Sequence, residues 1–246
     1  MFMLAFDTAT PAVTVALLDG VGAAPGTPSG PSAGTPAGPS AGTPGGAAAV
    51  TVVETVSVDA RRHGELLAPG IDRVLAGAGR SRRDLTDIAV GVGPGPFTGL
   101  RVGLVTAYAL GDTLGVPVHG VCTLDVLAYA YGLDGPFAVA TDARRREVYW
   151  ASYTDFRSRT SGPAVDRPAT VAARLAGLPV VGEGASIYRD CFPDAREPRL
   201  PSASALGRLA AERLAAGGAG LLPPQPLYLR RPDAAVPGAR KQVTPA

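Results

Sequence analysis

A glycine- and proline-rich turn between an apolar strand and an apolar helix is the feature of this sequence best suited to chemistry. The segment 91–101 reads GVGPGPFTGLR, follows the apolar residues 88–92 and leads into a helix expected from Thr98. A sharp turn of small residues at a helix start leaves free N–H groups, which suit a phosphate or a carboxylate. Gly93, Gly95 and Thr98 are therefore candidate anion-binding residues; the alternative is a connection kept small for packing. No Gly-Lys-Ser/Thr follows, and the glycine spacing does not fit a dinucleotide site.

Three polar residues at the first expected hairpin, Asp7, Thr8 and Thr10, are further candidates for contact with a nucleotide. They lie between two apolar, β-branched runs at 2–7 and 12–19. An acid at such a turn can serve the metal ion of a bound nucleotide, and the hydroxyls can face its phosphates. The alternative is a turn in which Asp7 and Thr10 hydrogen-bond the local backbone.

The small number of histidines limits the metal sites that this chain can form. The chain has only His63 and His119, more than fifty residues apart, whereas a helical His-x-x-x-His site needs two histidines one turn apart. His63 precedes a helix and His119 precedes a glycine turn, so each is expected to be a surface or cap residue. Asp142 and Glu147 could act as paired carboxylates, but they flank three arginines, and a salt-bridged hairpin tip is the simpler interpretation.

The helix expected at 98–114 carries no charge between Arg101 and Asp112. A helix that is apolar all round is buried on more than one side. Small residues recur in it at intervals of four and form a flat ridge: Gly99, Gly103, Ala107 and Gly111. Such a ridge lets another helix approach closely. That neighbour could be the helix at 65–78 of the same chain, but a small half-domain has few elements to bury the remainder, so we expect a partner protein.

Composition and charge are those of an ordinary globular protein. The 246 residues are 46% hydrophobic and 18% charged, with a net charge of +2, so charge alone does not indicate nucleic acid or membrane binding. Cys122 and Cys191 are far apart and lack metal spacing, which fits a reducing, cytoplasmic location. The start of the chain reads as a strand rather than a signal peptide, and no run is long enough to span a bilayer.

Residues 22–49 form a low-complexity insert. An eight-residue repeat rich in proline, glycine, serine and threonine occupies 31–46, without charge and with almost nothing to bury. We expect a flexible, partly polyproline-like spacer, disordered in the free protein. An SH3-type ligand is the alternative, but the flanking arginines and aromatics are missing.

Without the insert, the order of expected elements in the first half is βββαβαβα. The expected strands are 2–7, 12–19, 50–58, 88–92 and 116–120, and the expected helices are 65–78, 98–114 and 124–131. Gly115 and Pro117 mark the end of the second helix. This is the order of one half of an α/β fold of the actin-like, sugar-kinase-like (ASKHA) type.

A second, reduced half is expected to follow. Strands at 137–141 and 147–153 pair across the arginine hairpin, with another strand at 179–182 and a helix at 203–216. We expect this half to lack the full set of elements. We therefore divide the chain into an actin-like half at 1–122, carrying the insert, and a reduced half at 123–246 whose proline-rich tail lies over the surface.

Several motifs together resemble the signatures of the bacterial TsaB (YeaZ) family. They are FDTAT at 6–10, RHGELLAP at 62–69, GPGPFTGLR at 93–101, DARRREVY at 142–149 and PLYLR at 226–230. The resemblance covers nearly everything except the insert. It departs from the family at Pro96, where the family usually has Ser, which removes a hydroxyl and an N–H from the loop.

The resemblance implies a non-catalytic scaffold in the synthesis of threonylcarbamoyladenosine in tRNA. Such proteins resemble the transferase subunit TsaD in fold but lack its metal-binding histidines; they bind TsaD through N-terminal helices, and the ATPase TsaE joins them. It implies no tightly bound cofactor, with ATP or ADP only in the complex, and contact with tRNA through the complex. The residues expected at the partner interface are His63, Glu65, Leu67, Ile71, Leu100, Gly103, Leu104, Ala107, Tyr108 and Gly111.

Two alternatives stay open. An active kinase or acyltransferase of the actin-like fold would use the cleft between the halves, but it would need a second phosphate loop and an adenosine pocket in the second half. A homodimer would use the same helices as the expected heterodimer.

Overall fold

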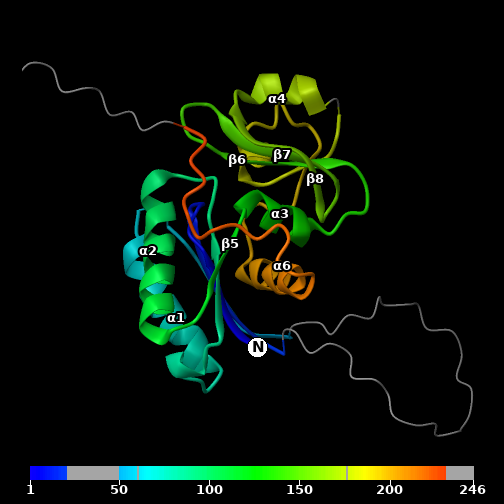
Figure 1. Ribbon diagram of the computed structural model, residues 1–246. Coiled ribbons are helices and arrows are strands. Elements are labelled where there is room, and N and C mark those ends of the chain that lie inside the picture. The colour runs from blue at the N-terminus through cyan, green and yellow to red at the C-terminus, as the bar shows by residue number, and fades with distance from the viewer. Residues whose placement is uncertain (21–49, 60, 176, 231–246) are drawn as a thin grey trace, which may run out of the picture.

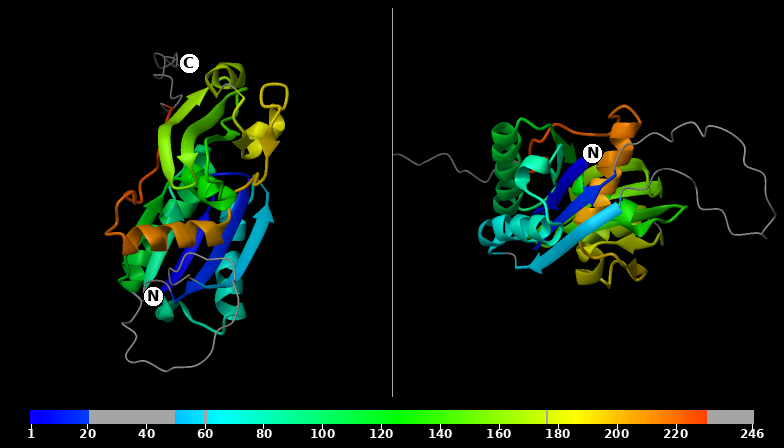
Figure 2. Two further views of the ribbon diagram at one scale, coloured as in Figure 1. Left: turned by 90° about the vertical axis from the view of Figure 1, so that its right-hand side faces the viewer. Right: turned by 90° about the horizontal axis from the view of Figure 1, so that it is seen from below.

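The computed structural model describes residues 1–20, 50–59, 61–175 and 177–230 of the chain. The repeat insert, interpreted above as a flexible spacer, lies outside these residues. The described chain forms two mixed β-sheets of five strands each. Helices cover both faces of each sheet, and the two halves are stacked along the long direction of the molecule (Figures 1 and 2). This confirms the predicted α/β fold.

The first half contains the elements that the sequence predicts, with ends shifted by one or two residues. Its strands are β1 (Phe2–Asp7), β2 (Ala12–Asp19), β3 (Val50–Val58), β4 (Asp87–Gly91) and β5 (Val118–Val121). Its helices are α1 (His63–Gly77), a single 3-10 turn η1 (Arg82–Asp84) and α2 (Phe97–Leu114). The sheet order is β3-β2-β1-β4-β5, in which β3, β2 and β1 run antiparallel and β1, β4 and β5 run parallel. Gly115 ends α2 in the left-handed conformation, with φ of 67°, as its position predicted.

Alternation along β1 explains why both faces of this sheet are covered. Successive side chains of a strand point to opposite faces. Leu4 and Phe6 pack in one cluster with the apolar stripes of α1 and α2. Met3 and Ala5 pack on the other side, with Leu206 and its neighbours from the last helix. Each large apolar side chain that is fully buried in this way contributes about 1.5–3 kcal/mol.

The second half repeats the topology of the first, which corrects the expectation of an incomplete set of elements. Its strands are β6 (Phe137–Asp142), β7 (Val148–Asp155), β8 (Ser158–Asp166), β9 (Val180–Val181) and β10 (Ala195–Arg196). Its helices are α3 (Thr123–Tyr131), α4 (Pro168–Leu175), α5 (Glu183–Ile187) and α6 (Ala203–Ala215). The order β8-β7-β6-β9-β10 has the same pattern of antiparallel and parallel pairs. The half is reduced in the length of β9, β10 and α5, not in the number of strands.

Segments from the end of the chain complete the first half. The helix α6 lies against β1 and β2 (Figure 2), and Arg213 of α6 pairs with buried Asp125 of α3 at 2.9 Å. From α6 the chain then runs past β5 toward the upper part of α2 (Figure 1). The backbone of Leu222 pairs with Gly120 of β5, and Leu227 N donates to Val92 O at 2.9 Å. Residues 221–230, the described part of the tail, therefore run along the first half and reach the second half through Arg230, whose Nη1 donates to Ala143 O.

Candidate functional site

The carboxylate of Asp7 is enclosed at the first hairpin rather than presented to a ligand. The side chain is fully buried. Its Oδ2 accepts a hydrogen bond from Thr123 Oγ1 at 2.7 Å, and its Oδ1 accepts one from Ala9 N at 2.6 Å. Burial raises the pKa of Asp7, and these two hydrogen bonds partly oppose the rise. Both oxygens are thus satisfied inside the protein, as in the local-turn interpretation.

The glycines of the proline-rich turn pack directly on this hairpin. A Cβ added at Gly91 would lie 1.9 Å from Asp7 Oδ2, and one added at Gly95 would lie 2.1 Å from Ala9 O. Thr8 Oγ1 donates to Gly99 O at 2.8 Å. The close approach of backbones is therefore a sufficient reason for glycine at these positions.

The predicted nucleotide residues are close in space, but they do not form one open site. A small cavity of about 170 Å³ is lined by Thr8, Thr10, Pro11, His63, Pro96, Thr98, Gly99 and Arg144. Within the described residues, Asp7 and Gly93 line neither this cavity nor the larger one described below, which Gly95 borders. Nucleotide binding by these residues stays a prediction, and the enclosure of Asp7 removes the acid that would hold its metal ion.

The two histidines make structural contacts far from each other in the fold. His63 Nε2 lies 2.8 Å from Thr10 O, and His119 Nε2 lies 2.9 Å from Asp87 Oδ1. His63 is the first residue of α1 and is buried, so its expected place at a helix start is correct but a surface position is not. His119 of β5 is partly buried. No group of three metal-ligating side chains occurs among the residues that the structure describes.

The ridge of small residues on α2 faces the protein's own first half, which corrects its assignment to a partner. A Cβ added at Gly103 would lie 2.4 Å from Thr8 Oγ1, and one added at Gly111 would lie 2.4 Å from Val118 Cγ2. The hairpin loop and β5 fill the space that a partner helix was expected to occupy. The residues predicted at the interface that are buried in this way are His63, Leu67, Ile71, Leu100, Gly103, Leu104, Ala107 and Gly111. Of the predicted set, Glu65 and Tyr108 are exposed.

The opposite face of α2 carries large apolar side chains that are exposed. Phe97 is 44% exposed, Val105 66% and Tyr108 47%. The absence of charge from the middle of α2 thus reflects two faces: one is buried in the chain and the other is apolar and open.

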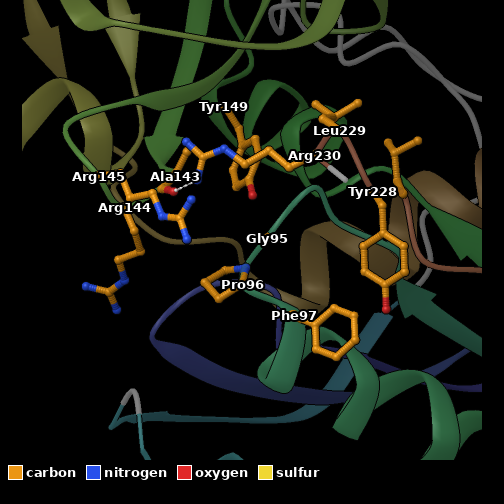
Figure 3. A pocket seen from close by; sticks show the side chains of 11 residues that line it. Gly95, Pro96, Phe97, Ala143, Arg144, Arg145, Tyr149, Tyr228, Leu229 and Arg230 are labelled. Atoms are coloured by element: carbon orange, nitrogen blue, oxygen red, sulfur yellow. Dashed lines mark hydrogen bonds between the residues drawn. The ribbon is translucent and has the colours of Figure 1, made fainter. Parts of the chain in front are cut away.

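A larger cavity of about 450 Å³ lies where the proline-rich turn, the arginine hairpin and the tail meet (Figure 3). Its walls combine flat or aromatic side chains with guanidinium groups. The lining residues are Gly95, Pro96, Phe97, Ala143, Arg144, Arg145, Tyr149, Leu227, Tyr228, Leu229 and Arg230. The Tyr149 ring is mostly buried, and burial raises its pKa, so its hydroxyl is neutral and able to donate at physiological pH.

The hairpin between β6 and β7 has an unusual backbone. Arg144, Arg145 and Arg146 have φ values of 60°, 56° and 59°, the left-handed region that costs about 1–2 kcal/mol per residue outside glycine. Asp142 supports the turn, because its Oδ1 accepts from Arg144 N at 2.9 Å and its Oδ2 lies 3.4 Å from Arg144 Nη1. The predicted salt-bridged tip is therefore confirmed for Asp142. Glu147 instead pairs with Arg230 of the tail, whose Nη1 donates to Ala143 O at 2.8 Å.

An aromatic contact fixes the other wall of the cavity. The rings of Phe97 and Tyr228 stack with centroids 5.3 Å apart. The Arg101 guanidinium lies 3.6 Å from the centroid of Phe97, and its Nε donates to Tyr228 Oη at 3.0 Å. The contact between Phe97 and Tyr228 was not predicted from the sequence. The signals that could have indicated it are an aromatic residue at the start of a helix and another in a proline-rich tail.

The two repeated halves, with a cavity at the seam between them, define an α/β protein of the actin-like class. Among the described residues, no helix has the length and apolar character needed to cross a membrane. The family model described as "TsaD: tRNA N6-adenosine threonylcarbamoyltransferase" matches residues 55–191.

Relatives are found both by sequence and by structure. An uncharacterized protein of Mycobacterium tuberculosis (strain ATCC 25618 / H37Rv) is 43% identical over 94% of this chain and 93% of its own length. The tRNA threonylcarbamoyladenosine biosynthesis protein TsaB of Escherichia coli (strain K12) is 40% identical over 38% of this chain and 42% of its own. The crystal structure of YeaZ from Pseudomonas aeruginosa superposes with a TM-score of 0.68 at 28% identity, covering 93% of this chain and 99% of that one. The chain belongs to the TsaB (YeaZ) family, within the wider group that the TsaD model describes.

Proposed function

We propose that this chain is a non-catalytic, cytoplasmic scaffold subunit in the biosynthesis of threonylcarbamoyladenosine in tRNA. It binds the TsaD-type transferase subunit, the TsaE-type ATPase joins that complex, and tRNA is contacted through it. Membership in the TsaB (YeaZ) family supports the pathway. The enclosure of Asp7, whose two carboxyl oxygens are both hydrogen-bonded within the protein, supports the scaffold role.

The observation that carries partner binding is the exposed apolar face of α2. Val105 and Tyr108 are three residues apart, so they lie on one side of the helix about one turn from each other. Large apolar side chains that gather on an open helix face mark an interaction surface, and aromatic residues are enriched at the centre of such interfaces. Glu65 of α1, held by Arg62 at 2.7 Å, belongs to the predicted interface and is accessible.

Substitution on this face tests the proposal. We expect Val105→Glu and Tyr108→Glu each to weaken binding to a co-expressed transferase subunit by at least about tenfold, because each places a charge in an apolar contact. Both side chains are exposed, so both variants should fold normally. Ile187→Glu is the matched control, since Ile187 is 49% exposed on α5 of the second half.

Pull-down followed by size-exclusion chromatography separates the outcomes. Loss of the complex in the two α2 variants, with the Ile187→Glu complex intact, supports the proposal. Equal binding by all three variants contradicts the α2 face as the interface. If wild type elutes as a dimer of itself and takes up no transferase subunit, the homodimer alternative is correct.

The alternative of an active nucleotide-binding enzyme has one observation in its favour, the description of the matching family model as a transferase. It predicts ATP hydrolysis or threonylcarbamoyl transfer by the purified chain alone. The scaffold proposal predicts neither, and places ATP or ADP only in the assembled complex.

A further inference from the structure

The larger cavity beside the arginine hairpin has a wall chemistry that the proposed partner contact at Val105 and Tyr108 of α2 does not use. Pro96, Phe97 and Tyr228 form a flat wall from the start of α2 and the tail, and Arg144 and Arg230 reach in from the opposite side (Figure 3). Neither Asp nor Glu occurs among the residues that line it. Its volume of about 450 Å³ lies in the usual range of sites that take a small molecule or a single building block of a polymer.

The two arginines differ in the hydrogen bonds and ion pairs that they form within the protein. Arg230 donates to Ala143 O at 2.8 Å and pairs with Glu147, so it supports the wall of the cavity. The Arg144 side chain is 58% exposed, and its partner Asp142 lies 3.4 Å away. Asp142 is mostly buried, but solvent around the exposed Arg144 guanidinium weakens the attraction between the two groups. The Arg144 guanidinium, which points toward Pro96 in Figure 3, is therefore available to an anion.

The positions of these groups are set before any ligand arrives. The hairpin is held in left-handed backbone conformations at Arg144 and the two residues that follow it, and such strain is typical of functional sites. The ring of Tyr228 is fixed by stacking on Phe97 and by its hydrogen bond from Arg101. A preformed aromatic wall opposite a cation loses little entropy when a planar, anionic ligand binds.

We propose that this cavity binds one unpaired nucleotide of an RNA strand, with the base against the Phe97–Tyr228 wall and its phosphate on Arg144. Unpaired bases are recognised by stacking on aromatic side chains, and arginine takes the phosphate. A free nucleoside triphosphate fits less well, because the lining holds no carboxylate for its metal ion and the glycine turn is packed on Ala9. This inference rests on the proposed function in tRNA modification and assigns this chain its own RNA contact.

Fluorescence anisotropy of the full chain tests the inference. The probe is a fluorescein-labelled RNA hairpin with the stem and loop of a tRNA anticodon arm, compared with a fully paired duplex of equal length. We expect tighter binding of the hairpin, and Arg144→Ala and Tyr228→Leu each to weaken it by about tenfold. Arg146→Ala is the matched control: it removes the same charge from the same strained turn, but Arg146 does not line the cavity. We expect it to weaken binding less than threefold.

Three results would overturn the inference. The hairpin and the duplex could bind equally, or Arg144→Ala and Tyr228→Leu could match Arg146→Ala. Alternatively, AMP or ATP with Mg²⁺ could bind the cavity while the hairpin shows no preference, which would assign it to a free nucleotide. Binding of the transferase subunit by the same variants distinguishes this inference from the scaffold proposal. The Arg144→Ala protein should bind the transferase subunit normally and the RNA hairpin more weakly. The Val105→Glu protein should bind the hairpin normally and the transferase subunit more weakly.

Discussion

At the scale of single residues, close packing explains the glycines of the family motifs in this chain. The glycines of the proline-rich turn and of the α2 ridge allow backbone and side chains of the Asp7–Thr10 hairpin to approach closely. Their spacing predicted a close approach correctly. It could not identify the neighbour, because a hairpin loop fills a ridge of small residues as well as a partner helix does.

Substitution at Gly103 distinguishes these two neighbours. We expect Gly103→Leu to overpack the contact with Thr8, since even a Cβ would lie 2.4 Å from its hydroxyl. Overpacking of this kind costs about 1–3 kcal/mol, or about 2–4 °C in melting temperature for each kcal/mol in a chain of this size. Thermal unfolding followed by circular dichroism measures it, with Ala109→Leu on the exposed face of α2 as the control. If the Gly103→Leu protein melts like wild type but fails to bind the transferase subunit, the ridge is the partner interface after all.

The buried carboxyl of Asp7 predicts a pH dependence of stability. Burial raises its pKa in the folded state above the unfolded value, so the folded protein binds the proton more tightly. Its contribution to stability is therefore complete below the ordinary pKa of an aspartic acid, and it is lost as pH rises through the raised, folded value.

Asp7→Asn removes this dependence. An amide has no charge to bury, and it still offers an oxygen to Ala9 N and an NH₂ group to the Thr123 hydroxyl. We expect the melting temperature of the variant relative to wild type to increase as pH is raised from about 4 to 8. A difference between the two proteins that stays constant over this range would show that Asp7 does not titrate differently in the folded state.

At the scale of elements, periodic and apolar segments could be predicted and short or polar ones could not. The strands and helices of the first half follow from their alternation and apolar stripes, with Gly115 marking the end of α2. The strand β8 was missed because its sequence SRTSGPAVD lies at a sheet edge, where most of its side chains are exposed. The five-residue α5 and the two-residue β10 are too short for a periodic pattern to show. The two-residue β9 lies within the strand predicted at 179–182.

The connection between β2 and β3 gives a prediction for the repeat insert. Asp19 and Val50, which flank the insert, are paired neighbours across an antiparallel ladder, so a short turn can join them. Deletion of residues 24–47 should leave the melting temperature and partner binding unchanged or slightly improved, since loop closure changes by only about 0.6 kcal/mol per doubling of length. Thermal unfolding and pull-down check this. A fall of many degrees would show that the insert packs on the body of the protein.

At the scale of the whole molecule, the contacts of the tail and the cavity that they form could not be predicted from the sequence. Tyr228 meets Phe97 and Arg230 meets Glu147, contacts between residues far apart in the sequence that carry no local pattern. They join the tail to both halves and form the cavity at the seam. The motifs at 93–101 and 142–149 contain the other two walls of this cavity, but the first was interpreted as an anion-binding turn and the second as a salt-bridged hairpin tip.

The central claim, a scaffold that works through the exposed face of α2, is tested most directly by reconstituted tRNA modification. Threonylcarbamoyladenosine in tRNA is measured by mass spectrometry after incubation with purified transferase and ATPase subunits, with and without this chain. We expect modification only when all subunits are present, loss of modification with Val105→Glu, and full activity with Ile187→Glu. Modification by this chain alone, or full modification by the other subunits in its absence, would contradict the account.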